Sequence, residues 1–169
     1  MPTDSVHHTL PARYYTSAQV FAEEMERFYF GSWICAGRAA QIDGPGDYFL
    51  REVAGESIII TRDTLGDVHA FYNVCRHRGT RMCTVAEGRF DGRIQCPYHG
   101  WTYGLDGTLK GTPDFAGVCD FNRAANGLVP IEIATWLLAG PGRNWHSATM
   151  SANAASSSHP RRATNSARK

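Results

Sequence analysis

Two short segments of the chain each place a cysteine close to a histidine. The first is Cys75-Arg76-His77 and the second is Cys96-Pro97-Tyr98-His99, with 18 residues between His77 and Cys96. In an extended or loop backbone, residues two apart project to the same side, about 6–7 Å apart, so one pair reaches two neighbouring metal atoms. A structural zinc site usually takes its cysteines from one segment and its histidines from another. The mixed pairs instead favour a binuclear centre, with two thiolates on one metal and two imidazoles on the other.

The composition favours a cytoplasmic protein that uses cysteine for chemistry. Five cysteines in 169 residues are too few and too unevenly spaced for a disulfide framework. The longest apolar runs, such as Ile58–Ile60, fall far short of the roughly 18 residues that span a bilayer. The N-terminus lacks the charged and then apolar pattern of a signal peptide. We therefore expect a cytoplasmic chain of about one domain, without a membrane partner.

A helix is expected over residues of about 17–30, within an N-terminal segment of residues 1–40. Thr16 and Gln19 have the spacing of a capping box, and Gly31 supplies a stop signal. Phe21, Met25 and Phe28 fall at helical spacing and form one apolar face. If this face packs on nothing, the chain will expose apolar area and associate.

An antiparallel β domain is expected over residues 41–136. Short segments rich in β-branched and aromatic residues are separated by turn residues. The expected strands are 48–53, 57–62, 68–74, 88–90, 93–96, 101–104 and 108–110. The dipeptides Asp91-Gly92 and Asp106-Gly107 are typical hairpin turns between neighbouring strands. The sequence therefore predicts a mainly β fold that begins with a meander.

Residues 137–169 differ from the rest of the chain in charge and composition. They contain five Lys or Arg and no acidic residue, whereas residues 1–136 hold all 16 Asp and Glu. The segment is rich in Ala, Ser, Asn and Arg and has no strand or helix period after its first residues. We expect a disordered tail. A basic nucleic-acid-binding tail is the alternative, but Arg161-Arg162 is its only support, so no nucleic-acid partner is expected.

The residues around the two Cys/His pairs resemble a known family. Segments 73–81 and 96–103, together with 10–15 and 46–49, are similar to the Rieske domain of the large (alpha) subunit of aromatic-ring-hydroxylating oxygenases. These Rieske non-haem iron oxygenases also include choline- and carnitine-type monooxygenases. The resemblance implies a Rieske-type antiparallel β-sheet domain. It also implies that Cys75, His77, Cys96 and His99 bind one [2Fe–2S] cluster.

The resemblance implies an electron-transfer function. In the family, a reductase or ferredoxin reduces the cluster, and oxygen is activated at a separate mononuclear Fe(II) held by two histidines and a carboxylate. The family includes dioxygenases and monooxygenases, and some of its members act in aromatic hydrocarbon catabolism. The resemblance therefore leaves the substrate open. The similarity ends near Trp136, after a run over 127–136 that looks like the approach to the iron domain. We therefore expect a truncated subunit with an out-of-frame tail, no mononuclear iron, no hydroxylation by the chain alone, and full-length oxygenase subunits as candidate partners.

Two features near the pairs bear on the cluster potential. Respiratory Rieske proteins carry two cysteines that cross-link the loops, and Thr80 and Tyr98 resemble those positions here. We therefore expect the low end of the range of about −150 to +300 mV. Gly79 and Gly100 are expected to let backbone amides approach the sulfides, unless they are plain turn residues.

Other residues near the pairs have two interpretations each. Arg76, Arg78 and Arg81 either steer an acidic redox partner or form a solvated loop face. Trp101 and Tyr103 either shield the cluster from water or fill the core.

The remaining cysteines and His69 are not expected to bind metal. Cys35, Cys83 and Cys119 are interpreted as small apolar residues or free thiols. His69 is interpreted as a surface residue of a strand.

Two alternative functions stay open at this point. One is a stand-alone Rieske ferredoxin, against which the oxygenase-like segments 10–15 and 46–49 argue. The other is a non-redox zinc-binding module, which would be colourless and would give no EPR signal after reduction.

Overall fold

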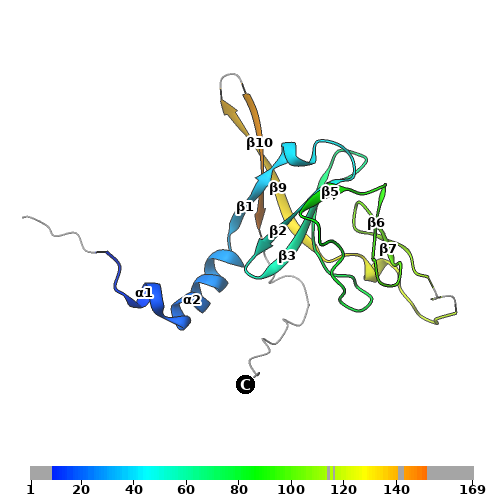
Figure 1. Cartoon of the computed structure of the whole chain (residues 1–169), viewed down its shortest axis with the longest axis horizontal. Helices are drawn as coiled ribbons and strands as arrows, with labels where there is room; N and C mark the ends of the chain where they lie inside the picture. The colour runs from blue at the N-terminus through cyan, green and yellow to red at the C-terminus, as the bar shows by residue number, and fades with distance from the viewer. Residues whose placement is uncertain (1–8, 114, 116, 141–142, 152–169) are drawn as a thin grey trace, which may run out of the picture.

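The computed structural model describes residues 9–113, 115, 117–140 and 143–151. A helical arm at the N-terminus leads into a large antiparallel sheet, and a smaller antiparallel sheet lies at the far end (Figure 1). This arrangement confirms the predicted mainly β, antiparallel fold. No helix in the described part of the chain is long and apolar enough to cross a membrane.

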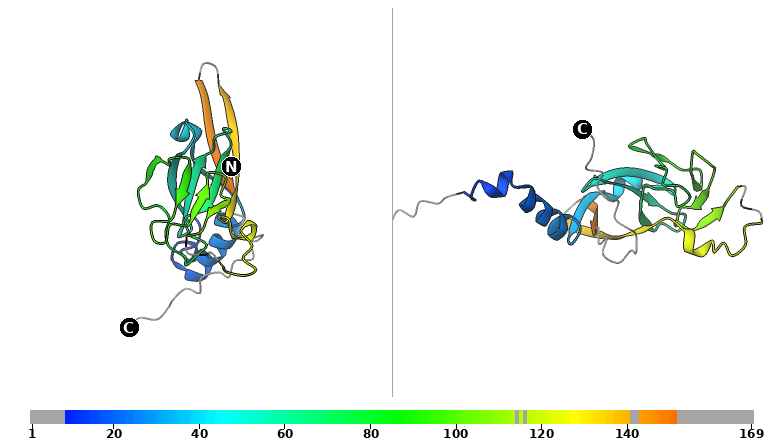
Figure 2. Two further views of the ribbon diagram at one scale, coloured as in Figure 1. Left: turned by 90° about the vertical axis from the view of Figure 1, so that its right-hand side faces the viewer. Right: turned by 90° about the horizontal axis from the view of Figure 1, so that it is seen from below.

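The N-terminal arm consists of α1 (Arg13–Thr16), α2 (Ala18–Glu24) and a π-helical turn, Met25–Tyr29. The arm projects away from the sheets (Figure 2). The predicted cap at Thr16 is wrong: Ser17 caps α2, and its Oγ accepts a hydrogen bond from the Val20 amide. Ser17 has the extended backbone that an N-cap requires, whereas Thr16 still belongs to α1 and donates to a carbonyl of the preceding turn.

The apolar face of the arm has little cover. Phe21 and Phe28 are each 60% exposed, and Tyr15 is 69% exposed. The expectation of exposed apolar area on this face is confirmed for these side chains.

The large sheet has seven strands in the order β1-β10-β9-β4-β3-β2-β5. Its strands are β1 (Trp33–Arg38), β2 (Asp47–Val53), β3 (Glu56–Arg62), β4 (Val68–Tyr72), β5 (Glu87–Arg89), β9 (Pro130–Gly140) and β10 (Arg143–Ser151). The predicted meander is confirmed as β2-β3-β4, in which Ile59 pairs with Leu50 on one side and Phe71 on the other. Strand β1 was not predicted. It is followed by a short 3-10 helix, Ala39–Ile42.

Strand β3 separates two apolar clusters. Ile58 and Ile60 face one cluster, which contains Phe49. Ile59 faces the other, which contains Phe71 and both cysteines of the Cys/His pairs. Alternate residues of a strand point to opposite faces, so a strand buried on both sides reads as a continuous apolar run. The second cluster is the part of the core that supports the candidate site.

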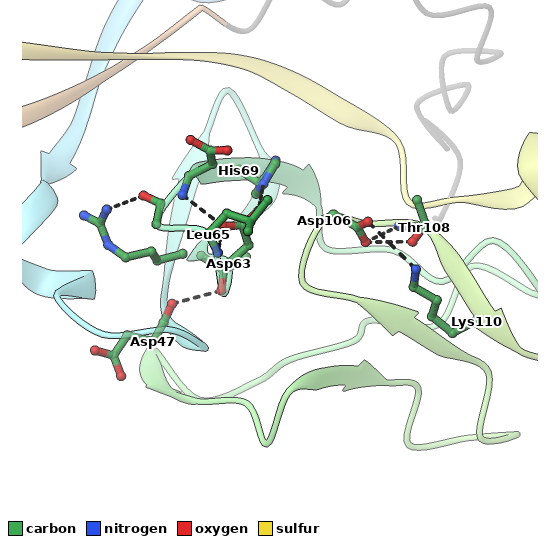
Figure 3. A network of polar contacts seen from close by, with 11 residues as sticks. Asp47, Asp63, Leu65, His69, Asp106, Thr108 and Lys110 are labelled. Atoms are coloured by element: carbon green, nitrogen blue, oxygen red, sulfur yellow. Dashed lines mark hydrogen bonds and ion pairs between the residues drawn. The ribbon is translucent and has the colours of Figure 1, made fainter.

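The small sheet consists of β6 (Arg93–Gln95), β7 (Thr102–Gly104) and β8 (Leu109–Gly111). The predicted hairpin at Asp106-Gly107 is confirmed, because β7 pairs with β8. Asp106 Oδ1 accepts hydrogen bonds from the amide and hydroxyl of Thr108 (Figure 3). Gly107 has φ +79°, and a Cβ there would lie 2.7 Å from Cζ of Phe71. This position therefore requires glycine on both backbone and steric grounds.

The predicted hairpin at Asp91-Gly92 is wrong. Gly92 has a positive φ of 64°, but the strands on either side do not pair with each other. Strand β5 pairs with β2 in the large sheet and β6 pairs with β7 in the small sheet. The dipeptide makes a turn that connects the two sheets, because β5 pairs back with β2 and β6 pairs onward with β7.

The first residues of the expected tail lie in strands. Strand β9 continues to Gly140, and β10 follows over Arg143–Ser151. Strand β10 pairs with β9 along its whole length and with β1 on its other side. Backbone hydrogen bonds hold such a ladder without any side-chain period, so composition alone did not reveal these strands. Residues 152–169 of the expected tail lie outside the described residues.

The turn between β3 and β4 is held by Asp63. Its carboxylate accepts hydrogen bonds from the amides of Leu65 and Asp67, and it lies 2.9 Å from Nε2 of His69 (Figure 3). Burial raises the pKa of Asp63, but the three hydrogen bonds outweigh this effect and hold its pKa below the ordinary value. His69 thus serves as a partner of Asp63 on the strand.

Candidate metal centre

The two Cys/His pairs lie on loops with the same backbone frame. In the loop after β4, the Cys75 amide donates to Thr80 O at 2.8 Å, and the Gly79 amide donates to Cys75 O at 3.0 Å. In the loop between β6 and β7, the Cys96 amide donates to Trp101 O at 2.8 Å, and the Gly100 amide donates to Cys96 O at 3.1 Å. Each loop therefore holds its cysteine in the same backbone position, and the histidine follows two residues later in the first loop and three residues later in the second.

Of the two interpretations of Gly79 and Gly100, the structure favours turn residues. Gly79 has φ +72° and Gly100 has φ +70°, a backbone region that favours glycine. Their amides are bonded to the cysteine carbonyls and close the loops, so these two amides are not available to bond to sulfide.

The two sulfur atoms lie together inside the apolar core. Cys75 is 1% exposed and Cys96 is 2% exposed. Burial raises the pKa of the Cys75 thiol, hydrogen bonds from the Tyr103 hydroxyl and the His77 amide lower it, and the neighbouring Cys96 raises it. Thiolates at this depth need a compensating positive charge, which a bound metal supplies. The sulfur pair therefore fits a metal atom.

The two imidazoles also lie together. The ring centroids of His77 and His99 are 4.6 Å apart. Nδ1 of His77 is buried and has no hydrogen-bond partner in the described part of the molecule. Burial lowers the pKa of His77, and the nearby His99 and Arg78 lower it further, so the neutral ring is favoured. A neutral imidazole with an unpartnered buried nitrogen is a typical metal ligand.

The donors are arranged as two pairs and not as a single-ion site. Within residues 9–113, 115, 117–140 and 143–151, no three His, Cys, Asp or Glu side chains gather closely enough to bind one ion. Paired sulfurs beside paired nitrogens match the donor set of a binuclear cluster, with thiolates on one iron and imidazoles on the other.

Aromatic rings enclose the imidazole pair. Trp101 is 2% exposed and stacks on His77 with a centroid distance of 4.9 Å and an interplanar angle of 6°. Phe115 contacts both His77 and Trp101 edge-on, and Phe121 packs on Trp101. Trp101 therefore both fills the core and covers one face of the His77 ring. Nothing in the sequence indicated that Phe115 and Phe121 lie at this site, because single aromatic residues in a loop carry no periodic signal.

Tyr103 contacts the sulfur pair directly. Its side chain is fully buried, and its hydroxyl lies 3.3 Å from Sγ of Cys75. The same oxygen accepts a hydrogen bond from the Arg76 amide at 3.1 Å, which leaves its proton to donate to the sulfur. Burial and the adjacent Cys75 raise the pKa of Tyr103, so the hydroxyl keeps this proton.

The outer side of the site is exposed. Tyr98 is 63% exposed, and its ring centroid lies 3.7 Å from that of His99. Arg78 is exposed on the first loop, whereas Arg81 forms an ion pair with Glu52. The arginines of the first loop therefore do not act as one uniform charged face.

The other cysteines are free thiols outside the paired donors. Cys35 and Cys119 are exposed, and Cys83 is buried. Burial raises the pKa of Cys83 to about 11, so it stays a thiol at neutral pH. None of these three cysteines forms a disulfide in the described part of the chain.

Comparison with known proteins agrees with this geometry. Residues 32–122 match the family model of the Rieske [2Fe-2S] domain. The chain is 40% identical over 126 residues to the glycine betaine monooxygenase oxygenase subunit of Chromohalobacter salexigens, covering 75% of this chain and 28% of that protein. It is 38% identical over 125 residues to the carnitine monooxygenase oxygenase subunit of Escherichia coli K12, covering 74% and 33%.

Solved structures show the same likeness. A quaternary ammonium Rieske monooxygenase in complex with L-carnitine matches with a TM-score of 0.78 and 33% identity, covering 88% of this chain and 40% of that one. Naphthalene 1,2-dioxygenase from Rhodococcus matches with a TM-score of 0.74 and 28% identity, covering 85% and 31%. The chain thus spans about a third of the length of its sequence relatives. It belongs to the Rieske [2Fe–2S] domain family, and its cofactor is a [2Fe–2S] cluster.

Proposed function

We propose that this chain is the electron-accepting Rieske domain of an oxygenase subunit of the quaternary ammonium monooxygenase type. Cys75 and Cys96 bind one iron of the cluster, and His77 and His99 bind the other. The observation that carries the proposal is the meeting of two buried sulfurs and two adjacent imidazoles on matching loops.

The bound cluster supplies one-electron redox chemistry, and the chain's own residues set its surroundings. Tyr103 donates a hydrogen bond to Sγ of Cys75. Trp101 and Phe115 pack against the ring of His77 and restrict its orientation. His99 lies against the exposed ring of Tyr98, and this exposed side of the site is where a redox partner would approach. A reductase or ferredoxin is the electron donor in this proposal.

The substrate class is proposed from the relatives. The proteins that match at 38–40% identity over this domain are named for glycine betaine and carnitine. In the structural comparison, the quaternary ammonium Rieske monooxygenase is 33% identical and the naphthalene dioxygenase from Rhodococcus is 28% identical. This difference favours a quaternary ammonium substrate over the aromatic hydrocarbon setting that the sequence resemblance first suggested. Hydroxylation itself is assigned to residues outside this domain, and a cytoplasmic setting stays a prediction.

Cluster binding is tested by anaerobic reconstitution with iron and sulfide. We expect about two irons and two sulfides per chain, visible absorbance, and a rhombic EPR signal after dithionite reduction. Cys96→Ser should lose the cluster, whereas Cys83→Ser, a buried thiol outside the donor set, should retain it. A colourless chain that binds one zinc ion instead would contradict the proposal and favour a zinc-binding module.

A further inference from the structure

We propose that Asn73 is a positioning residue that fixes the first ligand loop, and through it Cys75 and His77, in the geometry that binds the cluster. This inference rests on the proposed function. The side-chain hydrogen bonds of Asn73 go to Ser57, Met82 and Cys83 and to none of the four proposed ligands. Asn73 therefore acts through the loop and not as a ligand.

The side chain of Asn73 uses its full hydrogen-bonding capacity. It is 1% exposed and lies just beyond the end of β4. Its Oδ1 accepts from the amides of Met82 at 3.0 Å and Cys83 at 2.8 Å. Its Nδ2 donates to Cys83 O at 2.7 Å and to Oγ of Ser57 at 3.2 Å. An amide offers two acceptor positions and two donor positions, and all four are occupied here.

These bonds join the two ends of the ligand loop. The loop starts at Val74 and returns at Arg81, where the two residues form an isolated β-bridge. Asn73 precedes the loop, and Met82 and Cys83 follow it, so one side chain ties its two ends together. The bond to Ser57, which lies on β3, attaches this tie to the large sheet.

Neither alanine nor aspartate can reproduce all four bonds of this tie. Removal of the amide leaves the amides of Met82 and Cys83 and the carbonyl of Cys83 without their partner in a buried position, and Met82 is only 6% exposed. A buried polar group without a hydrogen-bond partner is destabilising, so the loop is driven to rearrange towards water. An aspartate keeps the two accepted bonds but faces the Cys83 carbonyl with a second acceptor. Cys75 lies two residues from the tie, so such a rearrangement displaces the ligand.

The test compares Asn73→Ala and Asn73→Asp with Thr61→Val as a matched control. Thr61 is fully buried, and its Oγ1 donates to Asp47 O at 2.9 Å within the sheet, away from the loop. The readouts on reconstituted protein are the rate of cluster loss to an iron chelator, the EPR line shape of the reduced cluster, and Tm. We expect Asn73→Ala to lose its cluster about tenfold faster than the wild type, with a broadened EPR signal. Thr61→Val should lower Tm and leave the cluster-loss rate and EPR signal unchanged.

The possible results separate this proposal from the proposed function. If both Asn73 variants lower Tm but match the wild type in cluster loss and EPR, Asn73 has a structural role only and the inference is overturned. If the wild type itself binds no cluster, the proposed function fails first. If Asn73→Ala does not fold, Asn73→Ser keeps an oxygen acceptor for a backbone amide. Faster cluster loss in that variant supports the inference, and a wild-type rate overturns it.

Discussion

Replacing Tyr103 with phenylalanine removes one hydroxyl group next to the proposed cluster and should lower its reduction potential. The hydroxyl lies 3.3 Å from Sγ of Cys75 and already accepts from the Arg76 amide, so its proton points to the sulfur. A donor beside a thiolate stabilises negative charge, and the reduced cluster carries one more electron than the oxidised one. The hydrogen bond is therefore stronger in the reduced state, and its loss favours the oxidised state.

The size of the change follows from the strength of such a bond. A hydrogen bond to a charged group contributes about 1.5–3 kcal/mol, and part of this is common to both oxidation states. If about 1 kcal/mol belongs to the reduced state alone, the one-electron relation of 59 mV per tenfold change gives a decrease of about 40 mV. The phenyl ring still fills the fully buried position, so packing changes little.

The measurement is a redox titration of the reconstituted protein followed by visible absorbance or circular dichroism. Tyr72→Phe is the control, because Tyr72 packs against the other apolar cluster. We expect its potential to stay within a few millivolts of the wild type, that is, well below the effect of losing one hydrogen bond. An unchanged or higher potential in Tyr103→Phe, with the cluster fully loaded, would refute the reasoning.

Three further outcomes can be measured. Gly107→Ala should destabilise the fold by about 3 kcal/mol, because it adds a steric clash to an unfavourable backbone region. Gly66→Ala, at φ +92° with open space around its Cβ, should cost only about 1 kcal/mol, and equal losses in urea unfolding would contradict this account. The pKa of Asp63 is lower in the folded chain than in the unfolded chain, so its contribution is full above the unfolded pKa of about 4 and is lost as pH falls through the folded pKa. The free energy of unfolding of Asp63→Asn should therefore fall less steeply with decreasing pH than that of the wild type. The same pH dependence in both proteins would exclude the explanation. Phe21→Glu combined with Phe28→Glu should reduce concentration-dependent association in sedimentation, whereas association unchanged by both charges would show that the arm is not responsible.

Local sequence signals predicted the elements that depend on neighbouring residues. The meander β2-β3-β4 follows from short β-rich segments joined by tight turns, and the β7–β8 hairpin follows from Asp106-Gly107. The spacing of the Cys/His pairs indicated paired donors before any fold was known. The structure then places Cys75 beside Cys96 and His77 beside His99. The meander and the hairpin are local because their turns and side-chain directions are set within a few residues, whereas the meeting of the two Cys/His pairs depends on the fold.

Pairing between distant segments depended on the tertiary structure alone. Asp91-Gly92 has a hairpin sequence but joins two sheets, since the partners of its flanking strands are β2 and β7. Strand β10 lies between β1 and β9 although its composition indicated disorder. Asn73 is one more polar residue in the sequence, and only the return of Met82 and Cys83 makes it the tie of a ligand loop. Backbone groups of distant segments become partners only after the chain has folded, so no local pattern could show which residues would meet.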